Sequence, residues 1–127
     1  MKTILVDGVS GLILKDGTLH QKMYELLEQY PNPKLVLTGA NEEQWKQFNL
    51  DNSPYEVFTL KHNPEKTNPE YFRILLNKYN LDQKDVIYFE HSQEATDTAR
   101  SLGIPTYFYD DTRQDIAALK EFFDANL

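Results

Sequence analysis

Short apolar runs alternate with amphipathic stretches along the whole chain. Five of the apolar runs are rich in β-branched and aromatic residues, and they predict strands at 3–6, 34–38, 56–59, 85–89 and 106–109. These runs are apolar nearly throughout, which is typical of strands that helices cover on both faces. The pattern therefore predicts the α/β class: a three-layer α/β/α, doubly wound (Rossmann-like) fold with a mostly parallel five-stranded sheet.

The amphipathic stretches predict helices between the strands, at 21–30, at 42–48, after Asn68, from Ser92 to Gly103, and after Thr112. Asn68 followed by Pro69 is typical of an N-cap and a first-turn proline. Gly103 is expected to form a left-handed C-terminal cap. Thr112 with Asp115 indicates a capping box at the start of the last helix. These residues are typical of helix ends and support the predicted alternation of strands and helices.

The segment 8–19, which follows the first strand, differs from the rest of the pattern. Two short apolar arms flank Asp16-Gly17, a dipeptide that is favoured in tight two-residue hairpin turns. The segment therefore predicts a small β-hairpin flap that stands just past the end of the first strand.

Composition narrows the class of protein. The 127 residues, 40% of them apolar, are enough for one core and predict a single domain over 1–127. The absence of cysteine excludes disulfides, thiolate metal sites and cysteine nucleophiles. The net charge of −7 disfavours nucleic acid and anionic lipid as partners. The short apolar run before Asp7 fits neither a signal peptide nor a membrane span, so we expect a cytoplasmic protein.

Polar residues follow the predicted strands where a doubly wound sheet binds its ligands, outside the carboxyl ends. Asp7 ends the first strand, Thr38-Gly39 the second and Glu90 the fourth, and Lys66 precedes the Asn68 helix. Taken singly, each of these residues is more often a cap, a turn or a surface residue. Together they suit phosphoryl transfer: Asp7 attacks phosphorus, Thr38 and the backbone around Gly39 hold phosphoryl oxygens, Lys66 neutralises charge, and Glu90 helps to hold Mg²⁺.

Four segments carry a resemblance to a known family. Residues 4–12 resemble an apolar strand followed by Asp-x-Asp-Gly-Thr/Val-Leu, and residues 35–38 resemble an apolar strand that ends in Ser or Thr. Residues 66–72 are similar to Lys-Pro-x-Pro-x-x-Phe, and residues 90–103 to Glu-Asp-Ser or Gly-Asp-Ser before a helix that ends in Gly. These are the four motifs of the haloacid dehalogenase-like (HAD) hydrolases, and the resemblance covers nearly the whole chain.

The resemblance implies a Mg²⁺-dependent phosphohydrolase that acts through an aspartyl-phosphate at Asp7, with Asp7, the Val9 carbonyl and Glu90 as metal ligands. Two departures imply that this activity is weakened or lost. Val9 stands where family phosphatases have the Asp that acts as general acid and base, and valine transfers no proton. His91 stands where they have a second metal-binding Asp, and neutral imidazole suits Mg²⁺ poorly.

Two interpretations of His91 stay open: a local hydrogen bond at a helix N-terminus, or a catalytic acid or ligand of a softer metal such as Mn²⁺ or Zn²⁺. For the whole chain, the alternative to an enzyme is a catalytically inactive HAD-fold binding or assembly module. A receiver domain is disfavoured because Lys66 lies too early in the chain. The dehalogenase branch also lacks the second Asp, but it needs a capped apolar pocket.

The spacing of the motifs leaves no room for a cap domain. Asp7 and Thr38 are 31 positions apart and Thr38 and Lys66 are 28 apart, and ordinary fold elements fill both intervals. An uncapped site is open to solvent. We therefore expect either a phosphorylated substrate or partner that is macromolecular, or a homo-oligomer whose neighbouring subunit covers the site.

Overall fold

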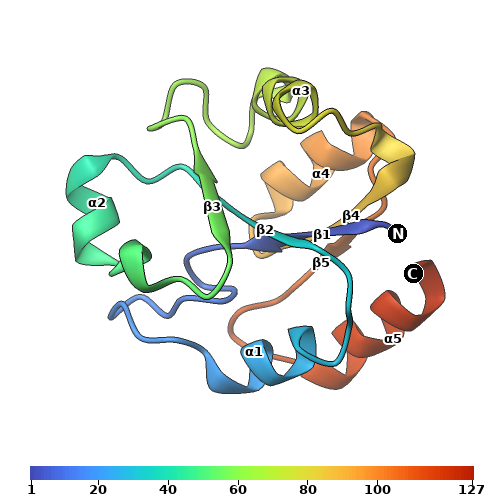
Figure 1. Cartoon of the computed structure of the whole chain (residues 1–127), viewed down its shortest axis with the longest axis horizontal. Coiled ribbons are helices and arrows are strands. Elements are labelled where there is room, and N and C mark those ends of the chain that lie inside the picture. Colours follow the sequence, from blue (N-terminus) through green and yellow to red (C-terminus); the bar gives the residue numbers. More distant parts are fainter.

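The computed structural model describes residues 1–127 and contains one five-stranded sheet whose strands are all parallel. The strands are β1 (Thr3–Asp7), β2 (Lys34–Thr38), β3 (Glu56–Thr59), β4 (Val86–Glu90) and β5 (Thr106–Phe108). Their order is β3-β2-β1-β4-β5, so β1 lies at the centre (Figure 1). This confirms the predicted doubly wound sheet.

The two edge strands are the shortest of the sheet. β3 has four residues and β5 has three, whereas β1, β2 and β4 have five each. β3 also has an exposed first residue, Glu56, while every residue of β4 is buried. The sheet is therefore longest and most deeply buried around β1 and β4.

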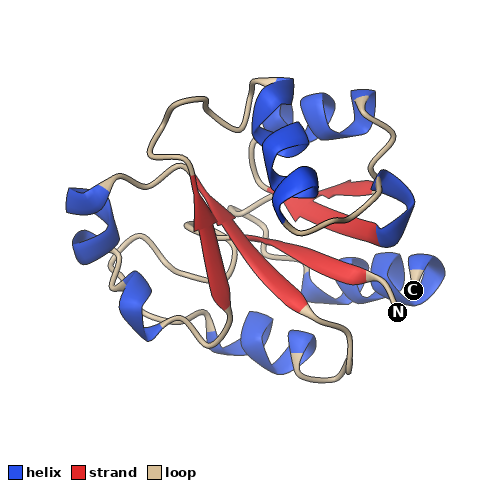
Figure 2. Ribbon diagram, turned by 45° about the horizontal axis from the view of Figure 1, so that its top comes forward, coloured by secondary structure: helices blue, strands red, loops and turns tan.

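Helices cover both faces of the sheet: α1 (Gln21–Leu27), α2 (Glu42–Gln47), α3 (Pro69–Lys78), α4 (Gln93–Ser101) and α5 (Ile116–Asn126). Figures 1 and 2 show α3 and α4 on one face, α1 and α5 on the other, and α2 beyond the carboxyl end of β2. Two short 3₁₀ turns, Leu50–Asn52 and Gln83–Asp85, precede β3 and β4. α1 ends at Leu27, before the predicted boundary. No helix combines the length and apolar character that a membrane crossing requires.

Two apolar clusters fix the sheet between its helices. Successive residues of β1 alternate between them: Ile4 and Val6 pack towards α1 and α5, and Leu5 packs towards α3 and α4. The helices contribute fully or almost fully buried side chains to these clusters, Met23, Leu26, Leu27, Leu119 and Phe123 on one face and Tyr71, Phe72, Leu75 and Ala99 on the other. Burying each large side chain contributes about 1.5–3 kcal/mol. The carboxyl ends of the central strands are therefore held firmly.

The helix ends agree with the sequence in two cases and differ in one. The Asn68 side chain accepts from the Glu70 N–H (3.0 Å) ahead of Pro69, and Gly103 adopts φ +81° after α4. The predicted capping box at Thr112 is wrong, because the Asp115 side chain caps α5 instead. The hydroxyl and amide of Thr112 both donate to the Asp110 side chain, which holds Thr112 in a turn before the helix.

The predicted hairpin is present in a reduced form, with a turn that differs from the predicted one. Residues 8–20 form a turn-rich loop, the flap, with only two isolated bridges, Val9 to Ile13 and Ile13 to Leu19. At its tip the Gly17 N–H donates to the Leu14 carbonyl (2.8 Å) and the Leu14 N–H to the Thr18 carbonyl (2.8 Å). With Gly17 at φ +86°, this is a three-residue turn that ends in a left-handed glycine, not the predicted two-residue turn.

Candidate active site

Asp7 is the last residue of β1 and is completely buried. The backbone turns sharply after it: the Gly8 N–H donates to the Leu37 carbonyl (2.9 Å) and the Leu12 N–H to the Asp7 carbonyl (3.0 Å). A Cβ at Gly11 would lie 2.4 Å from the Asp7 carbonyl oxygen, so only glycine allows this close approach. The flap therefore fixes the backbone that presents the Asp7 carboxyl group.

Asp7 belongs to a cluster of four ionisable side chains, Asp7, Lys66, Glu90 and His91, which we call the ion cluster. Lys66 Nζ donates to Asp7 Oδ1 (3.1 Å) and to Glu90 Oε1 (2.6 Å). The ring Nδ1 of His91 lies 2.5 Å from Asp7 Oδ2 and 3.2 Å from Glu90 Oε2. The backbone N–H of His91 also donates to Asp7 Oδ2 (2.9 Å). The structure thus brings Asp7, Lys66 and Glu90 together, as predicted from the order of the strands.

Glu90 has two further hydrogen-bond donors. The Tyr88 hydroxyl donates to Glu90 Oε1, and the Ser92 N–H donates to Glu90 Oε2 (2.9 Å). Sequence reasoning did not single out Tyr88. Its signal was nevertheless present, because side chains two residues apart on a strand share a face and a buried phenol needs a hydrogen-bond partner.

The ion cluster shifts the titration of its members. Burial lowers the pKa of Lys66, but the Asp7 and Glu90 carboxylates outweigh burial and hold this pKa above the ordinary lysine value. Burial raises the pKa of Glu90, but Lys66 and the hydrogen bond from His91 hold it well below its usual range. Burial and the nearby Glu90 raise the pKa of Asp7. Hydrogen bonds to Asp7 and Glu90 raise the pKa of His91 to about 10. The pKa values of the two acids therefore shift in opposite directions, although Lys66 and His91 contact both.

A cleft of about 520 Å³ opens directly over the ion cluster. Four predicted site residues, Val9, Thr38, Gly39 and Lys66, line it together with His91. Asp7 and Glu90 do not line it; they are fully buried and in contact with Lys66 and His91, which do. The lining has only one acidic residue, Glu65, in a chain of net charge −7. The lysine and histidine side chains around the cleft therefore outnumber its single acidic residue.

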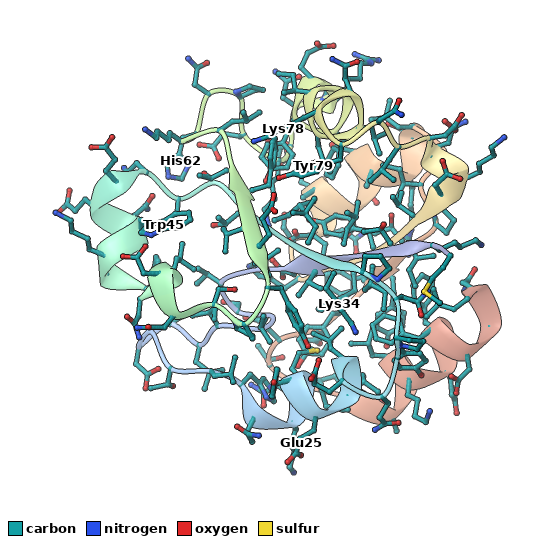
Figure 3. The ribbon with its side chains drawn as sticks, in the orientation of Figure 1. Glu25, Lys34, Trp45, His62, Lys78 and Tyr79 are labelled. Atoms are coloured by element: carbon teal, nitrogen blue, oxygen red, sulfur yellow. The ribbon has the colours of Figure 1, made fainter.

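The cleft has a buried side and an exposed side. Thr38, Lys66 and His91 form its inner wall: Thr38 Oγ1 accepts from the Ala40 N–H (3.1 Å), and the Tyr71 hydroxyl donates to the Thr38 carbonyl (2.8 Å). Its outer rim consists of the exposed residues Lys15, Gln47, His62 and Glu65. His62 lies near α2 (Figure 3). Its ring lies 2.9 Å from Glu65 and bonds to Gln44 of α2. Sequence reasoning did not find the rim, because these residues belong to no motif.

No protein-family model and no curated protein matches the sequence. Solved structures do match. A HAD family enzyme from Bacteroides thetaiotaomicron, solved as an aspartate-to-alanine variant with magnesium and inorganic phosphate, aligns with 85% of this chain and 93% of its own, at a TM-score of 0.65 and 15% identity. An uncharacterised protein from Corynebacterium glutamicum aligns with 98% of this chain and 96% of its own, at a TM-score of 0.68 and 12% identity.

The third similar structure is the core domain of a protein assigned as a phosphoglycolate phosphatase from Streptococcus pneumoniae. It covers 97% of this chain and 95% of its own, at a TM-score of 0.63 and 15% identity. The three alignments extend over most or nearly all of both partners and therefore compare whole folds. The chain has the fold of the haloacid dehalogenase-like hydrolases.

Proposed function

We propose that the chain is a phosphohydrolase that acts on phosphorylated substrates through an aspartyl-phosphate at Asp7. The observation that carries this proposal is Lys66, which bonds to Asp7 and Glu90 and also lines the cleft. A buried acid, a charge-neutralising lysine and the Thr38 hydroxyl thereby converge at one wall. The shared fold with a HAD family enzyme that was solved with phosphate supports a phosphorylated substrate.

The reaction follows from the residues of the inner wall. The substrate phosphoryl group contacts Lys66 and the Thr38 hydroxyl, and an Asp7 oxygen attacks phosphorus once the side chains above it move aside. The phosphorus–ester oxygen bond breaks, and the leaving oxygen takes its proton from water because Val9 supplies none. Water then attacks phosphorus in the acyl phosphate, which releases phosphate and restores the carboxylate. Loss of the general acid and base costs about 10²–10⁴ in rate, so turnover is slow.

The fold family implies Mg²⁺, and the resemblance implied Asp7, the Val9 carbonyl and Glu90 as its ligands. The side chains of this chain do not fit such a site. Every carboxylate oxygen of Asp7 and Glu90 already accepts from a protein donor: Lys66 and His91 for Asp7, and Lys66, Tyr88, Ser92 and His91 for Glu90. A hard cation would have to compete with these donors for the same oxygens. The proposed steps therefore use only the protein groups.

A second candidate is a phosphate-binding or assembly module without turnover. Two observations favour it: Val9 lies in the cleft where a proton donor would be needed, and Asp7 has no exposed surface. Both candidates share the basic inner wall and differ only in whether Asp7 reacts. In either case we propose that the cleft is uncapped, which favours a macromolecular substrate or partner.

The test compares phosphate release from an aryl phosphate ester by the wild type, Asp7→Asn and Val9→Asp. We expect slow release by the wild type, none by Asp7→Asn, and release at least tenfold faster by Val9→Asp, since a restored acid and base recovers part of the 10²–10⁴. Borohydride treatment of acid-quenched protein should convert a phosphorylated Asp7 into homoserine. Binding of orthovanadate without release by any variant would favour the binding module. Neither binding nor release would contradict both candidates.

A further inference from the structure

We propose that the His91 imidazole takes the place of a divalent cation in the ion cluster, so that this site receives a phosphoryl group with protein cations alone. The phosphoryl part rests on the proposed function. The replacement of the metal does not, and it has its own test. The four residues of the ion cluster lie at the carboxyl ends of β1 and β4 and in the segment before α3.

The His91 ring occupies the space between the two acids. Its Nδ1 lies between the two carboxyl groups, 2.5 Å from Asp7 Oδ2 and 3.2 Å from Glu90 Oε2. Neighbouring ligands of one octahedral Mg²⁺ at 2.0–2.1 Å lie about 2.9 Å apart. His91 Nδ1 contacts Asp7 Oδ2 directly, so the ring occupies the side of this oxygen that faces Glu90. His91 therefore bridges the carboxyl groups as a cation would.

Hydrogen bonds of the backbone and of the neighbouring Ser92 hold His91 in this position. The backbone N–H of His91 donates to the same Asp7 oxygen as the ring (2.9 Å). The next residue, Ser92, donates its N–H to Glu90 Oε2 (2.9 Å), and its side chain caps α4 by accepting from the Ala95 N–H (3.2 Å). The turn between β4 and α4 is thus fixed at three points. A metal ion that bridged Asp7 Oδ2 and Glu90 Oε2 would have to displace the His91 ring.

The basic and the acidic side chains of the ion cluster differ in whether they reach the cleft. Lys66 and His91 line the cleft, whereas both acids are fully buried. Lys66 and His91 each contact both acids, so these two basic side chains separate the acids from the cleft. Beyond the Glu65 carboxylate of the outer rim, a phosphoryl group at the inner wall meets Lys66, His91 and the Thr38 hydroxyl. In this arrangement His91 contacts the phosphoryl group and also positions Asp7.

The metal part is tested with Mn²⁺, a paramagnetic stand-in for Mg²⁺, by electron paramagnetic resonance of free Mn²⁺. We expect the wild type to bind no more Mn²⁺ than Asp7→Asn, and His91→Asp to gain one site that the double variant with Asp7→Asn lacks. A wild-type site that Asp7→Asn removes would overturn the proposal. If His91→Asp does not fold, the NMR signals of the His91 ring in the wild type decide: selective broadening by Mn²⁺ overturns the proposal, and unchanged signals support it.

The phosphoryl part is tested with orthovanadate by calorimetry, in buffer freed of divalent metals and in the same buffer with Mg²⁺. We expect wild-type affinities equal within twofold in the two buffers, and a loss of at least tenfold in both for His91→Gln. A wild type that binds orthovanadate only with Mg²⁺ would overturn the proposal. Failure to bind in either buffer would refute the proposed function and the phosphoryl part together, while the Mn²⁺ experiment would still decide the metal part.

Discussion

The inner wall and the outer rim of the cleft differ in the surroundings of their basic side chains. Lys66 and His91 of the inner wall each bond to two buried carboxyl groups, and their side chains are 16% and 31% exposed. On the outer rim, Lys15 is exposed, and His62 is exposed and pairs with the exposed Glu65. Water screens charges on the rim far more than those beside buried carboxylates. We infer that the inner wall selects the chemical group and the outer rim the molecule that carries it.

The largest expected effect comes from removing the central cation. Lys66→Met leaves Asp7 and Glu90 as adjacent buried acids, and breaking a buried pair in this way costs about 3–5 kcal/mol. Urea unfolding would measure the loss. Lys61→Met is the matched control, because Lys61 pairs with Glu42 (3.0 Å) at the surface, where a pair is worth about 0–1 kcal/mol. Similar losses in the free energy of unfolding for both variants would contradict the expected difference between the buried and the exposed ion pair.

A smaller effect is expected from the backbone beneath the inner wall. Gly11→Ala would place a Cβ 2.4 Å from the Asp7 carbonyl oxygen, and such overpacking costs about 1–3 kcal/mol. Gly39→Ala is the comparison, since its Cβ would meet a side chain at the rim, His62 Nδ1, at 3.0 Å. Thermal unfolding should show the larger loss for Gly11→Ala. A larger loss of stability for Gly39→Ala would mean that the flap accommodates an added Cβ more easily than the rim does.

The third prediction concerns pH. The pKa of His91 is raised to about 10 in the folded protein from an ordinary value of 6.5, so the folded state holds the proton more tightly than the unfolded state. The stability that His91 adds is therefore complete below pH 6.5 and is lost as the pH rises towards 10. The difference in urea midpoint between wild type and His91→Gln should shrink over this range. The same trend in His62→Gln would contradict an origin in the ion cluster.

The smallest effect is expected on the outer rim. Lys15→Ala should leave the free energy of unfolding unchanged within about 0.5 kcal/mol, as for most surface substitutions. If the substrate contacts Lys15, its KM rises by about two- to threefold at constant kcat, because an exposed ionic contact is worth only about 0.2–1 kcal/mol. Steady-state kinetics with the aryl phosphate would check this. A fall in kcat would contradict this prediction, because it would mean that Lys15, like the inner wall, acts on the reacting group.

The sequence predicted the sheet well because its strands are continuous apolar runs with few alternatives. It also brought Asp7, Thr38 and Glu90 to one edge, since parallel strands end on the same side. It did not predict that the His91 ring turns onto Asp7 Oδ2, because a side-chain direction depends on neighbours that are distant in the chain. The turn at Gly17 was missed for a related reason: Asp-Gly fits several turn types, and the packing of the flap selects one.

The short strands at the two edges of the sheet also bear on how copies of the chain can meet. An exposed edge offers unpaired N–H and C=O groups to a strand from another molecule, and short edge strands limit that opportunity. β5 offers three residues and β3 four. Joining two sheets into a continuous one is therefore disfavoured, and an assembly that covers the cleft would be built from side chains around its mouth.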